Sequence, residues 1–353
     1  MKKLVIADIL SVNNNGKLEG HYLTVAQNYI DMFEDEYEIY VSGGPIYNDK
    51  FSKIISLPYD TIPQKSKILN KLRVLCNFFE VLRKSKNAII VFQCSAVSTI
   101  MIGLLLKRPK NQVYIIQYDC QMISSKIKKR IFTKIKKRVR GIICPGEEIG
   151  DKLGLPYCIV PDYIFYGKVS SYSNIICDID FGIYGILAQG KGILEVAKKI
   201  ANMPYKLQIA GKVGSLPEDK RMITELQKIA ETAQNISLKI GYLDNEEYLS
   251  QIRRTKYCVL NYDKSYALRS SGVIFDSLFN CRPVLVKNRT YAEFVKNENI
   301  GVVYDEWDEI DIDKIIRPDY YLKLQNNIVQ YLEKQQRYKN ILASFLQNTR
   351  RNI

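Results

Sequence analysis

Short apolar runs alternate with longer amphipathic stretches along most of the chain. In the first half the apolar runs are LVIADIL, YEIYVSGG, AIIVFQC, QVYIIQYD and GIICPG. The second half repeats the theme with FGIYGIL, YKLQIAG, ISLKIGY, YCVLNY, PVLVKN and GVVYD. Apolar strands that alternate with helical patterns are typical of parallel sheets covered by crossover helices. The pattern therefore predicts an α/β protein with two doubly wound parallel sheets.

The join between the two predicted sheets falls within residues 163–180, where Gly, Ser and Tyr replace the apolar runs. We expect a first domain over residues 1–165 and a second over residues 166–317. After Pro318 the chain is polar and helical, so residues 318–353 are expected to form helices that pack back toward the first domain. A length of 353 residues suffices for two domains with full cores.

Composition and cysteine spacing narrow the class of protein. The longest apolar run, residues 96–106, is far shorter than the roughly 20 residues of a membrane-spanning helix. Two lysines precede the first apolar run, but Asp8 interrupts it and no small-residue cleavage site follows, which favours a buried strand over a secretion signal. The eight cysteines contain no C-x-x-C pair, so a zinc or redox motif is disfavoured. We expect a reduced, cytoplasmic protein.

The net charge of +15 is unevenly distributed. Residues 1–165 contain 25 Lys and Arg against 15 Asp and Glu, a net charge of +10, and the rest of the chain carries +5. The first half is therefore expected to face an anionic partner. Nucleic acid is one such partner, but no nucleic-acid-binding motif accompanies the charge. An anionic membrane surface is the partner that we favour.

Much of the charge lies in residues 125–141, where nine Lys and Arg fall among residues 126–140. Apolar residues recur there at every fourth position: Ile127, Ile131, Ile135 and Val139. We expect a helix whose apolar stripe faces the sheet and whose lysines meet anionic lipid headgroups. The basic stretch 65–86 adds Phe78 and Phe79 to this surface.

Small residues open a helical pattern in the second half. Ser270, Ser271 and Gly272 precede an apolar run in which Asp276 lies about one turn further in. The first N–H groups of a helix are free to bind an anion, and a carboxylate accepts two hydrogen bonds from a vicinal diol. The sequence therefore predicts a diphosphate site with a hydroxyl-binding carboxylate beside it.

A second helix of this half begins with Gly190, Lys191 and Gly192. A lysine at a helix start adds a cation where the helix dipole already favours negative charge. We predict that Lys191 binds phosphate, with a solvated lysine as the alternative.

The loop after the first strand carries Gly16 and Gly20, ahead of a helix that begins near His21. The glycines permit close backbone approach, and we expect this loop to take part in acceptor binding. Their G-x-x-x-G spacing differs from G-x-G-x-x-G, which disfavours a nicotinamide or flavin cofactor, and no cofactor is expected. His21 is the only histidine. It is a candidate catalytic residue, with an ordinary loop residue as the alternative.

The segments GILAQGKGILEVAKKI, KLQIAGKVGS, ISLKIGYLDNEEYLSQI and CVLNYDKSYALRSSGVIFDSLFNCRPVLV follow one another over residues 180–304. This order resembles the donor-binding half of the large retaining glycosyltransferase family with the E-x7-E motif (glycosyl transferases group 1). The first half is similar in outline only. The resemblance implies a GT-B fold, in which two Rossmann-like domains face a cleft. It also implies an enzyme that moves a sugar from a nucleotide diphosphate to an acceptor held against the first domain.

The resemblance assigns roles by position. Lys191 resembles the family lysine that meets the diphosphate, and Asp276 resembles the second acid of E-x7-E, which takes the ribose hydroxyls. The helix start that holds the distal phosphate falls at Ser271 and Gly272. The turn against which the nucleobase lies falls at Gly241, Tyr242 and Leu243.

Three positions depart from the family pattern. The first acid falls at Leu268, an arginine falls at Ile186, and the histidine near the sugar falls at Tyr118. Arg269 is a candidate to supply positive charge to the phosphates, with a solvated loop arginine as the alternative. Tyr118 and Asp119 lie at the end of a predicted strand, where we expect a sugar contact.

Retaining transfer of this kind requires stabilisation of the leaving diphosphate, which we assign to Lys191 and the helix start at Ser271. No metal is implied. Two D-x-D matches, at residues 178–180 and 311–313, are discounted because the first precedes its strand and the second lies in an acidic stretch.

We therefore expect a metal-independent glycosyltransferase at the cytoplasmic face of the membrane, acting on a lipid-linked saccharide in bacterial surface polysaccharide synthesis. Frequent Lys, Ile, Asn and Tyr favour a bacterium of low genomic GC content. One alternative is a non-catalytic relative that binds saccharide or partner enzymes, because of Leu268 and Tyr118. Another is a basic nucleic-acid-binding protein.

Overall fold

The protein is described by a computed structural model. The chain forms two compact units, one of residues Met1–Tyr166 with Gln336–Ile353 and the other of Gly167–Gln335. The described residues are 1–18, 22–93, 96–161, 164, 177–266, 271–289 and 292–348. The predicted domain boundaries after residues 165 and 317 stay predictions.

The first unit contains a parallel sheet of seven strands in the order β5-β4-β1-β6-β7-β8-β9. The sequence pattern predicts its five longer strands, and it misses the short strands β5 and β9 at the two edges. The strand bounds are β1 (Lys2–Ala7), β4 (Tyr37–Gly43), β5 (Ile54–Ser56), β6 (Ile89–Phe92), β7 (Gln112–Ile116), β8 (Gly141–Cys144) and β9 (Tyr157–Ile159).

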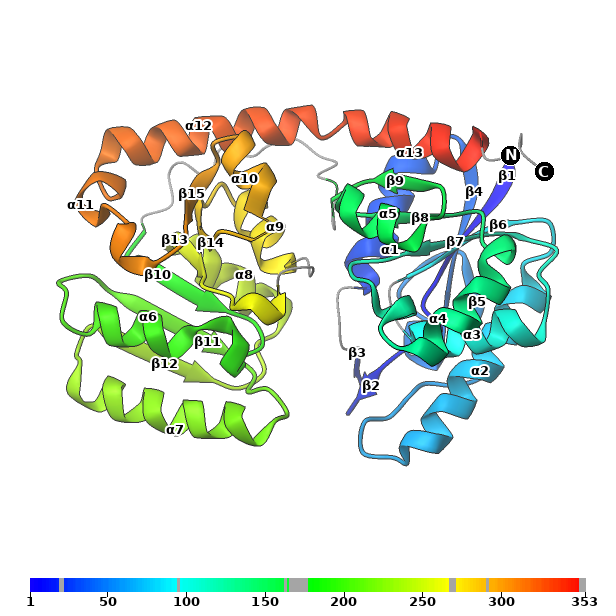
Figure 1. The fold of residues 1–353 in the computed structure, drawn as a ribbon, viewed down its shortest axis with the longest axis horizontal. Coiled ribbons are helices and arrows are strands. Elements are labelled where there is room, and N and C mark those ends of the chain that lie inside the picture. The colour runs from blue at the N-terminus through cyan, green and yellow to red at the C-terminus, as the bar shows by residue number, and fades with distance from the viewer. Residues whose placement is uncertain are drawn as a thin grey trace. The chain divides into compact units, whose positions relative to one another are not determined.

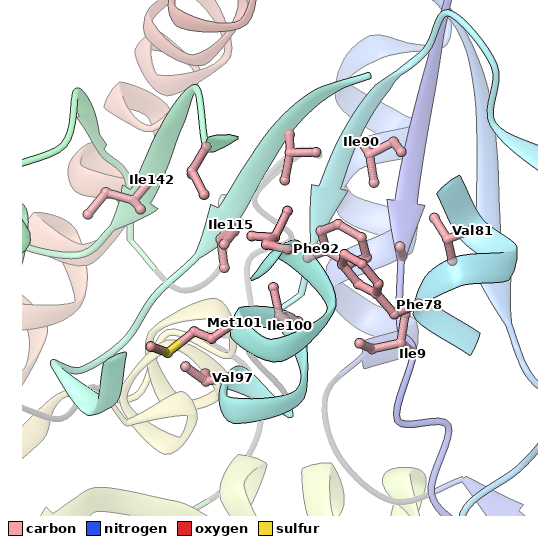
Figure 2. Close-up of a cluster of buried hydrophobic side chains, with 14 of the residues drawn as sticks. Ile9, Phe78, Val81, Ile90, Phe92, Val97, Ile100, Met101, Ile115 and Ile142 are labelled. Atoms are coloured by element: carbon pink, nitrogen blue, oxygen red, sulfur yellow. The ribbon is translucent and has the colours of Figure 1, made fainter. Parts of the chain in front are cut away.

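Helices cover both faces of this sheet. One face packs against α2 (Lys67–Lys84), α3 (Val97–Leu106), α4 (Lys126–Ile135) and α5 (Glu147–Leu153) through a core that includes Phe78 and Phe92 (Figure 2). The other face packs against α1 (Tyr22–Phe33) and α13 (Arg337–Asn348). The ring of Phe345 on α13 lies 5.4 Å from that of Tyr114 on β7. Both faces are buried, which explains why the strands are apolar throughout.

The prediction for the basic helix is partly wrong. Helix α4 ends at Ile135 and continues as a 3-10 turn, η3 (Lys136–Arg138). Phe132 and Ile135 are the residues that α4 buries, whereas Ile127 is 71% exposed. The first turn of α4 therefore presents an isoleucine and several lysines to solvent instead of packing on the sheet.

The same holds for the neighbouring basic stretch. Phe78 is fully buried in the core and so does not contribute to a basic surface, and Phe79 is partly buried against the edge of that core. The exposed apolar residues of α2 are instead Ile68, Leu69 and Leu72, in its first two turns. These two turns are the part of α2 that does not pack on the sheet.

The second unit contains a parallel sheet of six strands in the order β12-β11-β10-β13-β14-β15. Every pairing in this sheet is parallel. The strand bounds are β10 (Ile179–Tyr184), β11 (Leu207–Gly211), β12 (Ile236–Ile240), β13 (Thr255–Leu260), β14 (Val284–Lys287) and β15 (Gly301–Tyr304).

Successive side chains of these strands point to opposite faces. Ile183 lies in a core with α6 (Ile193–Ile200) and α7 (Pro217–Thr232), to which α11 (Ile312–Ile315) and α12 (Pro318–Lys334) also contribute. Its neighbour Tyr184 packs edge-on against Tyr248 of α8.

The second face of this sheet carries α8 (Asn245–Arg253), α9 (Gly272–Phe279) and α10 (Glu293–Asn297) (Figure 1). The predicted α/β architecture of two doubly wound sheets is confirmed. No helix within the described ranges combines the length and the apolar composition that crossing a membrane requires.

The packing of α2 on the core of the first unit can be tested by substitution of Phe78. Phe78→Ala removes a fully buried ring stacked on Phe92 at 5.3 Å. We expect the free energy of unfolding to fall by about 3–5 kcal/mol, measured by urea unfolding followed by circular dichroism. Leu72→Ala on the same helix, 55% exposed, is the control, with an expected change below about 0.5 kcal/mol. Equal effects would contradict this packing of α2.

Candidate functional site

Three neighbouring strands of the second sheet reach a glycine at their carboxyl ends: Gly185 after β10, Gly211 in β11 and Gly241 after β12. A side chain at Gly211 is excluded, because its Cβ would lie 1.7 Å from the carbonyl oxygen of Gly185. The backbone N–H of Gly241 donates to the carbonyl of Gly211 at 2.9 Å. The strands therefore end in closely packed backbone, at the edge where parallel sheets bind their ligands.

The turn that follows β10 is fixed from two sides. It forms η5 (Gln189–Lys191), and the backbone N–H of Gln189 donates to the buried carboxylate of Asp219 on α7 at 2.8 Å. On the other side, the N–H of Asp263 donates to the carbonyl of Gly190 at 2.9 Å. Gly192 has a φ of 62° and approaches Asn261 so closely that a Cβ would lie 2.3 Å from its carbonyl oxygen. Both neighbouring elements thus determine the position of Lys191.

Lys191 is only 8% exposed. Among the residues that the structure describes, it has no ion pair and its Nζ makes no hydrogen bond. The ring of Tyr262 lies beside it, with its centroid 5.3 Å from Nζ. Burial lowers the pKa of the ammonium from its ordinary value of 10.5 to about 8, and Tyr266 acts in the opposite direction. A buried cation without a counter-ion is suited to binding an anion.

The start of α9 lies beside this ammonium. A Cβ on Gly185 would lie 3.8 Å from Nζ of Lys191 and 3.6 Å from Cγ2 of Val273, in the first turn of α9. Ser271 precedes the helix in an extended conformation and is 7% exposed. The predicted neighbourhood of Lys191 and the Ser271–Gly272 helix start is therefore present. The ammonium and the first N–H groups of the helix combine two features that favour phosphate.

Asp276 lies one turn into α9 and is half-buried. Its Oδ2 accepts a hydrogen bond of 2.7 Å from the hydroxyl of Tyr248 on α8. Burial, followed by the charge of Asp276, raises the pKa of Tyr248 well above its ordinary value of 10.0, so the phenol stays protonated. Tyr248 therefore orients the carboxylate. The sequence does not indicate this role of Tyr248, because α8 and α9 are separate elements and Tyr is common in this chain.

The predicted nucleobase turn follows β12. Gly241 has open space around it and Tyr242 is 49% exposed, while Leu243 is half-buried. Asp244 then begins α8 by accepting a hydrogen bond from the N–H of Glu247. At this edge Ile186 is 59% exposed, where the resemblance places an arginine.

Five residues implicated by the sequence lie outside the described part of the chain. They are Gly20, His21, Leu268, Arg269 and Ser270. The roles predicted for them stay predictions.

In the first unit, Tyr118 and Asp119 follow β7. Asp119 accepts a hydrogen bond of 2.9 Å from the N–H of Gln121 and so stabilises the turn η2 (Gln121–Ile123). Tyr118 lines a small pocket with Tyr29 of α1. Gly16 lies in a tight hairpin between β2 (Asn13–Asn14) and β3 (Lys17–Leu18), an element that the sequence did not predict. The sugar and acceptor roles of these residues stay predictions.

The acids of the two D-x-D matches have partners. Asp178 pairs with Arg254, which lowers the pKa of that carboxyl, and Asp180 pairs with Lys256 at 2.9 Å. Asp311 begins α11 by accepting from the N–H of Lys314. Asp313 accepts from the hydroxyl of Tyr205 at 2.9 Å. Each acid thus has a local structural role.

No protein-family model matches the chain, and no curated protein matches it. Solved structures do match it at low sequence identity. An α,α-trehalose-phosphate synthase (UDP-forming) from Burkholderia xenovorans, in complex with glucose-6-phosphate, has a TM-score of 0.71 and 6% identity over 99% of this chain and 100% of that chain. A trehalose-6-phosphate protein from E. coli, bound with UDP-2-fluoro glucose, has a TM-score of 0.71 and 9% identity over 98% and 99%.

HepE from Anabaena, in complex with UDP, has a TM-score of 0.67 and 12% identity over 98% of both chains. These similarities extend over nearly the whole chain and include both sheets. They show that the fold is GT-B, as the family resemblance implied.

The burial of the Lys191 ammonium predicts how the free energy of unfolding depends on pH. The pKa of Lys191 is lower in the folded than in the unfolded chain, so the unfolded chain binds more protons between about pH 8 and 10.5, and stability contributed by this group rises across that window. We therefore expect Lys191→Met to raise the free energy of unfolding at neutral pH, by on the order of 3 kcal/mol.

This gain in the stability of Lys191→Met is expected to disappear above about pH 10.5. Urea unfolding at neutral and at alkaline pH measures it. Lys198→Met is the control, because Lys198 is an exposed member of an ion pair with Glu225. A Lys191→Met protein that is less stable than the wild type at neutral pH would contradict the burial of an unpaired ammonium.

Proposed function

We propose that the protein is a glycosyltransferase. It moves a sugar from a nucleotide diphosphate to a lipid-linked or oligosaccharide acceptor in bacterial surface polysaccharide synthesis, with retention of configuration. The observation that carries the proposal is the buried ammonium of Lys191, which has no ion pair among the described residues and lies beside the start of α9. The electrostatic attraction of such an ammonium is greatest for a ligand of high negative charge, and the diphosphate of a nucleotide sugar is a ligand of this kind.

The same groups account for catalysis. Charge builds on the departing diphosphate oxygen as the bond to the sugar breaks, and a fixed cation with fixed N–H donors stabilises that charge without reorganisation. Lys191 and the Ser271–Gly272 helix start would supply them. Asp276, oriented by Tyr248, would accept hydrogen bonds from the two ribose hydroxyls. The reaction as proposed uses no metal and no cofactor beyond the donor itself.

The fold supports a nucleotide-sugar donor. Solved GT-B structures similar to this chain contain UDP or UDP-2-fluoro glucose, in HepE from Anabaena and in the E. coli protein respectively. In the turn of Gly241, Tyr242 and Leu243, the 49% exposed ring of Tyr242 would offer a face on which a nucleobase stacks.

We further propose that the first unit binds an anionic membrane surface from the cytoplasmic side, with the tip of α2 as the contact. Ile68 and Leu72 lie on one side of α2 because they are four residues apart, and they are 72% and 55% exposed. The accompanying charges are all positive: Lys65, Lys67, Lys71 and Arg73. Exposed aliphatic side chains among lysines match an anionic interface.

The position of this tip suits a lipid-linked acceptor. Gln64, just before α2, donates a hydrogen bond of 3.1 Å to Asn14 in the hairpin that carries Gly16. The predicted acceptor loop thus lies next to the proposed membrane contact. An acceptor sugar carried on a lipid would emerge beside the loop that is expected to bind it.

A non-catalytic saccharide-binding relative is the second candidate. It is favoured by Leu268 and Tyr118, which replace a family acid and a family histidine. Nucleotide binding without transfer to any lipid-linked acceptor would support this candidate.

Calorimetry with UDP and GDP tests the donor site. We expect Lys191→Ala to weaken binding of the nucleotide and of inorganic pyrophosphate by about 10- to 100-fold, because a charged hydrogen-bond partner of the phosphates is lost. Asp276→Ala is expected to weaken the ribonucleotide about tenfold and to leave pyrophosphate and the 2′,3′-dideoxy nucleotide unchanged. Lys198→Ala is the control. A wild-type protein that binds neither nucleotide would overturn the proposed donor site.

Vesicle co-sedimentation tests the membrane contact, with phosphatidylcholine vesicles that contain or lack phosphatidylglycerol. We expect binding to the anionic vesicles only, reduced at least about tenfold by Ile68→Ser with Leu72→Ser, since two aliphatic side chains no longer enter the interface. Leu322→Ser, at a 53% exposed position of α12, is the matched control. Unchanged binding by the α2 variant would rule out the tip as the contact.

A further inference from the structure

Tyr262 connects the two phosphate-binding features of the second unit. It follows β13 and is 3% exposed. Its ring centroid lies 5.3 Å from Nζ of Lys191, and its hydroxyl lies 3.0 Å from Oγ of Ser271, within hydrogen-bonding distance. One buried side chain thus contacts both the ammonium and the residue that begins α9.

We propose that Tyr262 is a positioning residue of the donor site, a role that rests on the proposed function: its ring keeps Lys191 charged and in place, and its hydroxyl orients Ser271 toward the diphosphate. No pattern in the sequence indicates this role. It emerges only where the loops after β10 and β13 meet.

The ring acts on the charge of Lys191. The face of an aromatic ring attracts a cation, and the attraction is strongest where water is excluded. Burial alone favours the neutral amine, so a ring at this place offsets part of the desolvation. Tyr266 also faces the ammonium, with its ring 4.7 Å from that of Tyr262.

The acids of the surrounding elements do not neutralise this ammonium. Asp219 of α7 binds the N–H of Gln189, and Glu195 of α6 binds the amide of Asn261. Neither forms an ion pair with Lys191 in the described part of the chain. Among the described residues, the aromatic side chains of Tyr262 and Tyr266 are therefore the groups that support the charge.

The hydroxyl acts on Ser271. This serine does not use its hydroxyl to cap α9, since no N–H of the helix donates to it. Burial raises the pKa of Tyr262 to about 12, so its hydroxyl keeps its proton over the physiological range. The tyrosine thereby fixes the serine hydroxyl at the helix start, where the first N–H groups are available to phosphate.

The pH dependence of UDP binding tests the proposal, measured by calorimetry between about pH 7 and 10, where the diphosphate charge is constant. Wild-type binding should weaken as the pH rises through the pKa of Lys191, and Lys191→Met should abolish this dependence. We expect Tyr262→Leu to move the midpoint down by about one pH unit. Tyr262→Phe keeps the ring, so it should leave the midpoint unchanged and weaken binding about fivefold throughout.

If Tyr262→Leu does not fold, a double variant tests the role of the Tyr262 hydroxyl independently. Tyr262→Phe combined with Ser271→Ala should bind UDP no more weakly than Ser271→Ala alone, because the hydroxyl acts through the serine. Tyr205→Phe, which removes a hydroxyl bound to Asp313, is the control and should have no effect. Additive losses in the double variant, or an unmoved midpoint in a folded Tyr262→Leu protein, would overturn the positioning role.

The pKa of Lys191 can also be followed by NMR in the protein without nucleotide, with Lys191→Met to assign the signal. A shift on Tyr262→Leu is expected there too. Absence of any UDP or GDP binding by the wild type would overturn the proposed donor site. An unchanged pKa in Tyr262→Leu, with normal wild-type binding, would overturn the role of Tyr262 alone.

Discussion

The main constraint at the carboxyl ends of the strands of the second sheet is the burial of one ammonium group, that of Lys191. Lys191 is 8% exposed and, among the described residues, has no carboxylate to balance it, an arrangement that proteins rarely retain without a ligand. The backbone around it is hydrogen-bonded on both sides, because the carboxylate of Asp219 accepts from the N–H of Gln189 and the backbone N–H of Asp263 donates to the carbonyl of Gly190. The turn therefore holds the cation in place, and the unmet interaction is the one that an anion would supply.

The corresponding edge of the first sheet provides a contrast. Asp8, at the end of β1, is also completely buried, but its carboxylate accepts hydrogen bonds from the N–H of Ser11 at 3.1 Å and from the hydroxyl of Tyr47 at 2.7 Å. A buried charge whose partners are all within the protein holds a loop together. A buried charge without them is a candidate binding site, and this difference separates Asp8 from Lys191.

The sequence predicts those parts of the molecule that depend on local pattern. The apolar strands and the positions of Lys191, Ser271 and Asp276 follow from the alternation of strand and helix, since parallel strands end at one edge. Tyr248 and Tyr262 could not be predicted, because their partners lie on other elements. Ile127 was misplaced because periodicity shows which side of a helix is apolar, but not how far the helix extends past the sheet.

Because Ile186 is apolar, the charge of Lys191 matters more for the proposed binding of phosphate. Ile186 is exposed at the place where the resemblance implies an arginine, so in the proposed donor site Lys191 and the dipole of α9 would supply positive charge that a second cation would otherwise share. Desolvation strengthens the attraction of the ammonium for phosphate but also favours its neutral form. The two effects oppose each other near neutral pH. In the proposed donor site, a ring would stabilise the cation without neutralising it, whereas a carboxylate in the same place would compete with the diphosphate.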